Sequence, residues 1–247
     1  MKGPLAILTA FLFLASLASA AVLEVGVKEK LDANLSSMIY DNSSNFVKFS
    51  FEFYNKGSVP FKARIKNEIS GNDTVFVGWS QEKELMPGDK KSFEIYWYAS
   101  SAGDYSSKIK AYYGNDIKEY KSFDIAISNY IEPEDVFNIS SFRTYDSYVV
   151  FDLTSSKDVE NVVVIPQKYT PGWIFEQKEI VNMSQNSSRT VVLNYTPSLW
   201  TPSNVTIGIV SDNGKYYTEK DVEMDKSTGL AGLFYYVIDS LKIAFSK

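Results

Sequence analysis

Short stretches in which apolar and polar residues alternate constrain this chain of 247 residues more than any other feature. In "FEIYWY", which covers residues 93–98, the alternate positions are Phe93, Ile95 and Trp97. Because successive side chains of a strand point to opposite faces, these three predict a core face. The intervening residues predict a half-exposed face: Glu94, Tyr96 and Tyr98.

Segments of this kind recur along the chain, with turn sequences between them. Seven lie between residues 22 and 128, at 22–31, 46–55, 61–69, 74–85, 91–99, 105–114 and 117–127. Seven more lie between 137 and about 224, at 137–143, 148–155, 159–167, 172–181, 188–196, 204–212 and 215–224. The sequence "DNG" at 212–214 predicts a hairpin turn between the last two. A stretch without alternation, 129–136, predicts a linker. We expect an all-β chain of two tandem immunoglobulin-like β-sandwiches, residues 22–128 and 137–225.

The composition restricts the chemistry that is open to this fold. The chain has 25 Lys and Arg against 30 Asp and Glu, a net charge of −5, so it offers no basic track for nucleic acid. It has no cysteine, so its domains must hold by core packing, and no histidine, which removes the commonest general base and metal ligand. We predict a non-enzymatic protein without a catalytic residue, metal or cofactor.

Carboxylates leave two alternatives open. The densest cluster is Glu132, Glu134 and Asp135, in the linker, where a solvated acidic segment is the expectation and weak calcium binding the alternative. The turn at 211–214 also resembles a fragment of a calcium loop. A pair of carboxylates is the remaining arrangement that would support hydrolase chemistry in this chain.

The first residues have the pattern of an export signal. Lys2 precedes an apolar run that ends near Leu17, and the small residues 18–20 follow. We predict a signal peptide over residues 1–20, cut after Ala20, with an uncleaved membrane anchor as the alternative. The run is shorter than the roughly 20 residues that span a bilayer.

Asn-x-Ser/Thr sequons are frequent enough to indicate glycosylation, although crowding of these residue types into turns would also produce them. They begin at Asn34, Asn42, Asn72, Asn138, Asn182, Asn186, Asn194 and Asn204.

Tyrosines form the candidate ligand or partner face. By parity, four lie opposite core positions and would form an exposed surface able to stack on sugars or dock a protein if their strands share a sheet: Tyr54, Tyr96, Tyr98 and Tyr112. Tyrosine also favours strand surfaces in general, which is the structural alternative.

The last residues change from period two to a helical period, which predicts an amphipathic helix over residues 230–246. Its apolar stripe consists of Leu230, Leu233, Phe234, Val237, Ile238, Leu241, Ala244 and Phe245. A helix of this length, about 24 Å, is too short to cross a bilayer, so it would lie on a membrane, pack on a partner helix or fold back on a sandwich.

Two stretches resemble known surface modules. "ELMPGDKKSFEIYWYASSAGDYSSKIKAYYG", with Leu85, Pro87, Gly88, Phe93, Trp97, Gly103 and Tyr105, and "YNKGSVPFKARI", with Asn55 and Gly57, resemble cell-adhesion-related (CARDB) modules of archaeal and bacterial exported proteins. "VVVIPQKYTPGWIF" and "SSRTVVLNYTP", with Pro166, Gly172, Trp173 and Pro197, are similar to the NEW3 kind, which accompanies glycosidases and S-layer-type proteins. The resemblance implies fold and setting, with no catalytic residue to transfer.

Together these patterns predict a secreted, glycosylated protein of a prokaryotic, archaeal-type cell surface. Its role would be structural, adhesive or scaffolding, with other envelope or surface-layer proteins as partners and the membrane surface reached through the C-terminal helix. The alternative is a carbohydrate-binding accessory module that uses the surface tyrosines.

Overall fold

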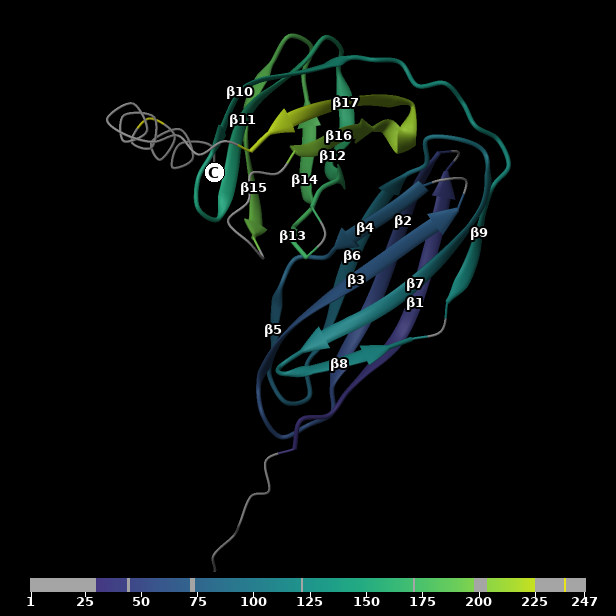
Figure 1. Cartoon of the computed structure of the whole chain (residues 1–247), viewed down its shortest axis with the longest axis vertical. Helices are drawn as coiled ribbons and strands as arrows, with labels where there is room; N and C mark the ends of the chain where they lie inside the picture. Colours follow the sequence, from purple (N-terminus) through teal and green to yellow (C-terminus); the bar gives the residue numbers. More distant parts are fainter. Residues whose placement is uncertain are drawn as a thin grey trace, which may run out of the picture. The chain divides into compact units, whose positions relative to one another are not determined.

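The computed structural model describes residues 30–43, 45–71, 74–120, 122–170, 172–197, 204–224 and 238. The chain divides into Met1–Lys30, of which only Lys30 is described, and one compact unit, Leu31–Lys247. In the described ranges up to residue 224, every regular element is a strand except the 3-10 turn η1 at Asp212–Gly214 (Figure 1). The prediction of an all-β chain is therefore confirmed.

The first half of the chain contributes two antiparallel sheets. One sheet has the strand order β1-β2-β6, and the other has the order β4-β3-β7-β8, with β5 paired to β3 and β9 paired to β7. The strands are β1 (Ala33–Ser43), β2 (Phe46–Asn55), β3 (Phe61–Gly71), β4 (Thr74–Trp79), β5 (Lys83–Leu85), β6 (Lys90–Tyr98), β7 (Gly103–Tyr113), β8 (Asp116–Glu119) and β9 (Phe123–Ile127).

The second half contributes two more antiparallel sheets, ordered β10-β11-β15-β13 and β14-β12-β16-β17. Its strands are β10 (Phe137–Thr144), β11 (Tyr148–Ser155), β12 (Val159–Lys168), β13 (Ile174–Phe175), β14 (Lys178–Met183), β15 (Ser188–Thr196), β16 (Asn204–Ser211) and β17 (Tyr216–Glu223). The turn η1 joins β16 to β17, and these two strands pair along their length. The expected hairpin at 212–214 is thus present.

Each pair of sheets encloses an apolar cluster, which is the arrangement of a β-sandwich. In the first half, Phe93, Ile95 and Trp97 of β6 are fully buried together with alternate residues of β2 and β3. In the second half, Phe151 and Ile207 belong to a separate cluster. Alternation produces this result directly, since every second side chain of these strands faces the opposite sheet.

One strand was not predicted, and two predicted segments lie outside the described residues. Sequence patterning missed β1, where apolar residues do not alternate regularly and the pairing with β2 shifts register between Leu35 and Ser37. The signal segment 1–20 and the C-terminal segment 230–246, apart from Ile238, lie outside the described residues. Within the described ranges, no helix has the length and apolar character needed to span a membrane.

Candidate functional site

The most elaborate contact in the described structure joins the two halves, and we call it the junction. It consists of Asn45, Phe46, Tyr96 and Tyr98 from the first half and Tyr169, Gln177, Gly214 and Tyr217 from the second. The alternation patterns that predict the strands do not indicate this contact between the halves.

A glutamine side chain completes the edge of a sheet at the junction. β6 lies at the edge of its sheet. The Gln177 Oε1 atom accepts a hydrogen bond from the Tyr96 N–H at 2.6 Å, and its Nε2 atom donates to the Tyr96 carbonyl at 2.7 Å. Gln177 is only 7% exposed, so it satisfies both backbone groups of one residue in a buried setting.

Two tyrosine rings stack across the same contact. Tyr98 of β6 and Tyr217 of β17 have ring centroids 3.9 Å apart and planes inclined by 6°. The Tyr98 hydroxyl accepts a hydrogen bond from Asn45 Nδ2 at 2.9 Å. Burial raises the pKa of Tyr98 to about 12, and it also raises the pKa of Tyr217, with Glu219 adding to that shift. Tyrosine is already neutral at ordinary pH, and these shifts extend the neutral form of both side chains further into alkaline solution.

The segment 129–136, expected to be a linker, forms hydrogen bonds with both halves of the chain. Asn45 Nδ2 donates to the Ile131 carbonyl at 2.5 Å, and Asn45 Oδ1 accepts from the Ile131 N–H at 3.1 Å. Further along, the Glu134 N–H donates to the Lys215 carbonyl and the Tyr217 N–H donates to the Glu134 carbonyl. A free tether would leave these backbone groups to water.

Apolar surface is also shared between the halves. Val163, Ile165 and Val210 come from strands of the second half, but they pack in the apolar cluster of the first. At Gly214, an added Cβ atom would stand 2.9 Å from the Phe46 Cβ atom. The backbone of the η1 turn therefore approaches β2 more closely than a side chain permits.

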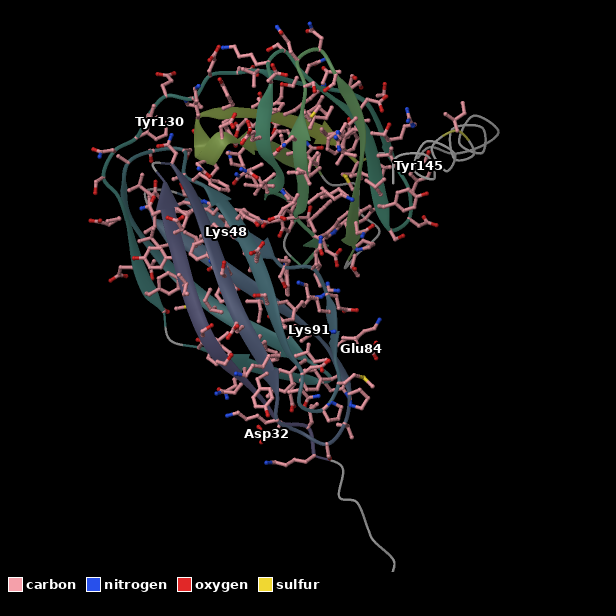
Figure 2. The ribbon with its side chains drawn as sticks, turned by 180° about the vertical axis from the view of Figure 1, so that it is seen from behind. Asp32, Lys48, Glu84, Lys91, Tyr130 and Tyr145 are labelled. Carbon is pink, nitrogen blue, oxygen red and sulfur yellow. The ribbon has the colours of Figure 1, made fainter. Side chains whose placement is uncertain are left out.

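A hollow of about 390 Å³ lies beside the Gln177 contact, lined by Gln81, Lys83, Phe93, Glu94, Tyr96, Gln177, Lys178 and Glu179. Glu94 of β6 accepts a hydrogen bond from the Tyr96 hydroxyl at 2.7 Å and pairs with Lys48 at 2.8 Å; Lys48 is labelled in Figure 2. The Glu179 side chain of β14 lines the same hollow, close enough for the charge of Glu94 to act on it. Burial, then the charge of Glu94, raises the pKa of Glu179.

The predicted tyrosine face does not exist as one exposed surface. Tyr96 and Tyr98 are only 5% and 4% exposed, because the second half covers them. Tyr112 lies on β7, in a different sheet from the other three, and its ring contacts Trp79. Tyr54 is half-buried, beside the cations of Lys56 and Lys90. The half-exposed interpretation of Tyr96 and Tyr98 is therefore wrong.

Of the predicted glycosylation positions, seven are described and Asn72 is not. Six are exposed: Asn42, Asn138, Asn182, Asn186, Asn194 and Asn204. Asn34 is half-buried. Two of the exposed amide nitrogens donate hydrogen bonds within the fold: Asn42 Nδ2 to the Ala126 carbonyl at 3.0 Å and Asn194 Nδ2 to Glu176 at 3.3 Å.

The acidic segment shows pairing with protein groups. Glu134 forms an ion pair with Lys157, and Asp135 accepts a hydrogen bond from the Thr218 hydroxyl. Among the described residues, no group of three or more acidic side chains is placed to hold a metal ion. In the turn expected to resemble a calcium loop, Asp212 accepts instead from the Glu160 N–H.

Comparison with known proteins yields no relative from which a role can be transferred. No protein-family model matches the chain, and no curated protein matches it. Among solved structures, it is similar to red sea bream transglutaminase, with 10% identity and a TM-score of 0.28 over 81% of this chain and 31% of that one. It is also similar to the N-terminal periplasmic domain of ScsB from Proteus mirabilis, with 10% identity and a TM-score of 0.30 over 77% and 92% of the two chains.

Proposed function

We propose that this chain is a non-enzymatic, exported protein of the cell surface, in which two immunoglobulin-like sandwiches act as one stiff structural or scaffolding unit. The observation that carries the proposal is the buried double hydrogen bond between Gln177 and the Tyr96 peptide. Interfaces between domains of one chain usually permit relative motion unless they are large and apolar. This junction combines shared apolar packing with directional bonds, as a spacer or scaffold requires.

A local feature supports the immunoglobulin-like part of the proposal. The Tyr105 hydroxyl, at the start of β7, donates to the carbonyl of Ser101 at 2.8 Å, and the Tyr105 ring packs on the buried Trp97 at 4.8 Å. A tyrosine that bonds back to the chain a few residues upstream, and a buried strand tryptophan, are recurrent features of such sandwiches.

The setting rests on sequence. The predicted export signal at 1–20, the frequent sequons and the resemblance to surface modules all favour a secreted glycoprotein held near a prokaryotic envelope, with other envelope or surface-layer proteins as partners. The carbohydrate-binding alternative loses two of its four tyrosines, because Tyr96 and Tyr98 are covered.

Crosslinking on intact cells of the native host tests this role. We expect full-length protein to be recovered on the outside of the cell, covalently joined to envelope proteins, with recovery reduced for a Gln177→Ala variant that loosens the junction. The matched control is Gln185→Ala, which changes an exposed glutamine of the same half. Recovery in the cytoplasmic fraction, or saturable binding to a glycan array, would contradict the proposal.

A further inference from the structure

The η1 turn at the junction carries a dipeptide that can react with itself. Asn213-Gly214 is the one Asn-Gly pair in the sequence. Glycine has no Cβ atom, so its peptide nitrogen is sterically open to the side chain that precedes it. That nitrogen can attack the asparagine Cγ atom and close a five-membered succinimide ring. Asn213 is exposed, so water also reaches the reacting side chain.

The backbone of the folded turn keeps the reacting atoms apart. Asn213 lies in the left-handed region, with φ 55° and ψ 37°. Ring closure requires the Gly214 nitrogen to eclipse the Asn213 Cβ atom about the Cα–C bond. In an L-residue at this ψ, the nitrogen instead lies nearly trans to Cβ. Succinimide formation therefore requires the Gly214 peptide to rotate by nearly half a turn.

Packing at the junction opposes this rotation. Gly214 is buried, and a Cβ atom added to it would stand only 2.9 Å from the Phe46 Cβ atom of the first half. The Lys215 N–H donates to the Asp212 carbonyl at 3.3 Å, and the Lys215 carbonyl accepts from the Glu134 N–H at 3.2 Å. These contacts fix both ends of the turn, so the peptide can rotate only when the turn leaves Phe46.

We propose that Asn213 is a self-modification site that the closed junction holds inactive. When η1 leaves Phe46, the Gly214 nitrogen attacks the Asn213 Cγ atom. The bond between these two atoms forms, the Cγ–Nδ2 bond breaks, and the leaving nitrogen takes up the proton of the attacking amide and departs as ammonia. Water then opens the ring at one of its two carbonyls and leaves aspartate or isoaspartate at position 213. Water is the only co-reactant.

The two products differ in what they do to the junction. Aspartate keeps the length of the main chain and adds one exposed charge. Isoaspartate routes the main chain through Cγ, which inserts an extra carbon into the backbone of a turn that has no spare space beside Phe46. Formation of isoaspartate therefore makes an opening of the junction irreversible.

Deamidation rates test whether the junction guards Asn213. The rate in the folded protein is the rate of the open turn multiplied by the fraction of time that the turn is open. In mildly alkaline buffer, the full chain should therefore deamidate at Asn213 at least about tenfold more slowly than a peptide of residues 209–218. Peptide mapping by mass spectrometry measures both rates, and equal rates would overturn the proposal.

A variant that weakens the junction should accelerate the reaction. Gln177 holds the Tyr96 peptide, and the Tyr96 ring stacks on Phe46 at 5.7 Å, so the three residues should open together. Gln177→Ala should deamidate at Asn213 about 5–30-fold faster than the parent protein, whereas Gln185→Ala, at an exposed position of the same half, should keep the parent rate.

Hydrogen exchange separates an opened junction from general unfolding. The amides of β11, which lies inside its sheet, should stay protected in Gln177→Ala. Equal rates in Gln177→Ala and Gln185→Ala would contradict the guarding role of the junction. A faster reaction that appears only with loss of β11 protection would do the same, because Asn213 would then respond to unfolding of the whole second half.

The purified isoaspartyl protein tests the second step. The Tyr96 N–H donates to Gln177 across the closed junction, so its protection against hydrogen exchange should fall several-fold when position 213 is isoaspartate. The matched control is Asn213→Asp, which adds the charge without lengthening the backbone and should keep the parent protection. Unchanged protection in the isoaspartyl protein, or an equal fall in Asn213→Asp, would refute the irreversible opening. The inference does not depend on the cellular role proposed above.

Discussion

The ring of Tyr98 lies parallel to the ring of Tyr217, at a centroid distance of 3.9 Å, so that one strand from each half shares a single stacked pair. Aromatic pairing of this kind adds about 0.5–1.5 kcal/mol beyond the burial of the rings. It also places an ionisable hydroxyl where a charge would be poorly solvated, which gives the junction a response to alkaline pH.

Alkaline pH should destabilise the protein through Tyr98. Its pKa is raised from 10.0 to about 12 by burial, so its contribution is complete below pH 10.0 and is lost as the pH rises through about 12. The loss should be on the order of 2 kcal/mol. Unfolding by denaturant at a series of pH values measures it. Tyr98→Phe should be less stable at neutral pH but should lose less stability over that interval, and an identical slope would contradict the assignment.

Removing the Gln177 amide should destabilise the junction. In Gln177→Ala, the N–H and carbonyl of Tyr96 lose their partners at a buried edge, which should cost about 1–3 kcal/mol of unfolding free energy. Chemical denaturation of the full chain measures this loss. Gln185→Ala, at an exposed turn, should change the unfolding free energy by less than about 0.5 kcal/mol. Equal effects of the two substitutions would show that the Gln177 contact adds nothing.

Gly88 and Gly214 have similar φ angles but different surroundings, so replacing each by alanine distinguishes the cost of backbone strain from the cost of a steric clash. Gly88 has φ +86° and no atom within 4 Å of the point where a Cβ atom would stand, whereas Gly214 has φ +92° and the Phe46 Cβ atom at 2.9 Å. Gly88→Ala should cost about 1 kcal/mol through backbone strain alone. Gly214→Ala should cost about 2–4 kcal/mol, because a clash is added. Thermal unfolding of the two variants compares them, and a Gly214 substitution as mild as that at Gly88 would mean that the halves separate easily.

Sequon occupancy should follow the engagement of each amide, if the protein is glycosylated after it folds. Asn42, Asn138, Asn186 and Asn194 are all exposed. The amide nitrogens of Asn42 and Asn194 donate hydrogen bonds within the fold, whereas those of Asn138 and Asn186 donate none to the described residues. Glycopeptide mass spectrometry on protein from the native host should find higher occupancy at Asn138 and Asn186. The reverse order would show that modification precedes folding or that these bonds are readily broken.

The strands of both sandwiches could largely be predicted, because burial of one face leaves a period of two in the sequence. Segments 46–55, 148–155 and 188–196 coincide with β2, β11 and β15. The pattern failed for β1, whose register shift breaks the alternation. It also merged β4 with β5, since the polar residues between them do not interrupt the period.

The junction could not be predicted, for a physical reason. A strand pattern distinguishes buried from exposed faces only when one face is apolar and the other polar. β6 is buried on both sides near its end, by the core and by the second half, and tyrosine suits either setting. Gln177 and Asn45 carry no periodic signal at all, because a buried amide is recognised only through the backbone groups that it contacts.

The edge position of β6 has a consequence for the separated halves. An uncovered edge strand presents free N–H and carbonyl groups that recruit strands from other molecules. In the whole chain, Gln177 occupies these groups at Tyr96, and the Tyr217 ring covers the neighbouring Tyr98. The first half produced alone would expose this edge together with two buried tyrosines, and light scattering should show it to self-associate where the whole chain stays dispersed. We therefore expect the second half to protect the first from aggregation by covering the edge of β6.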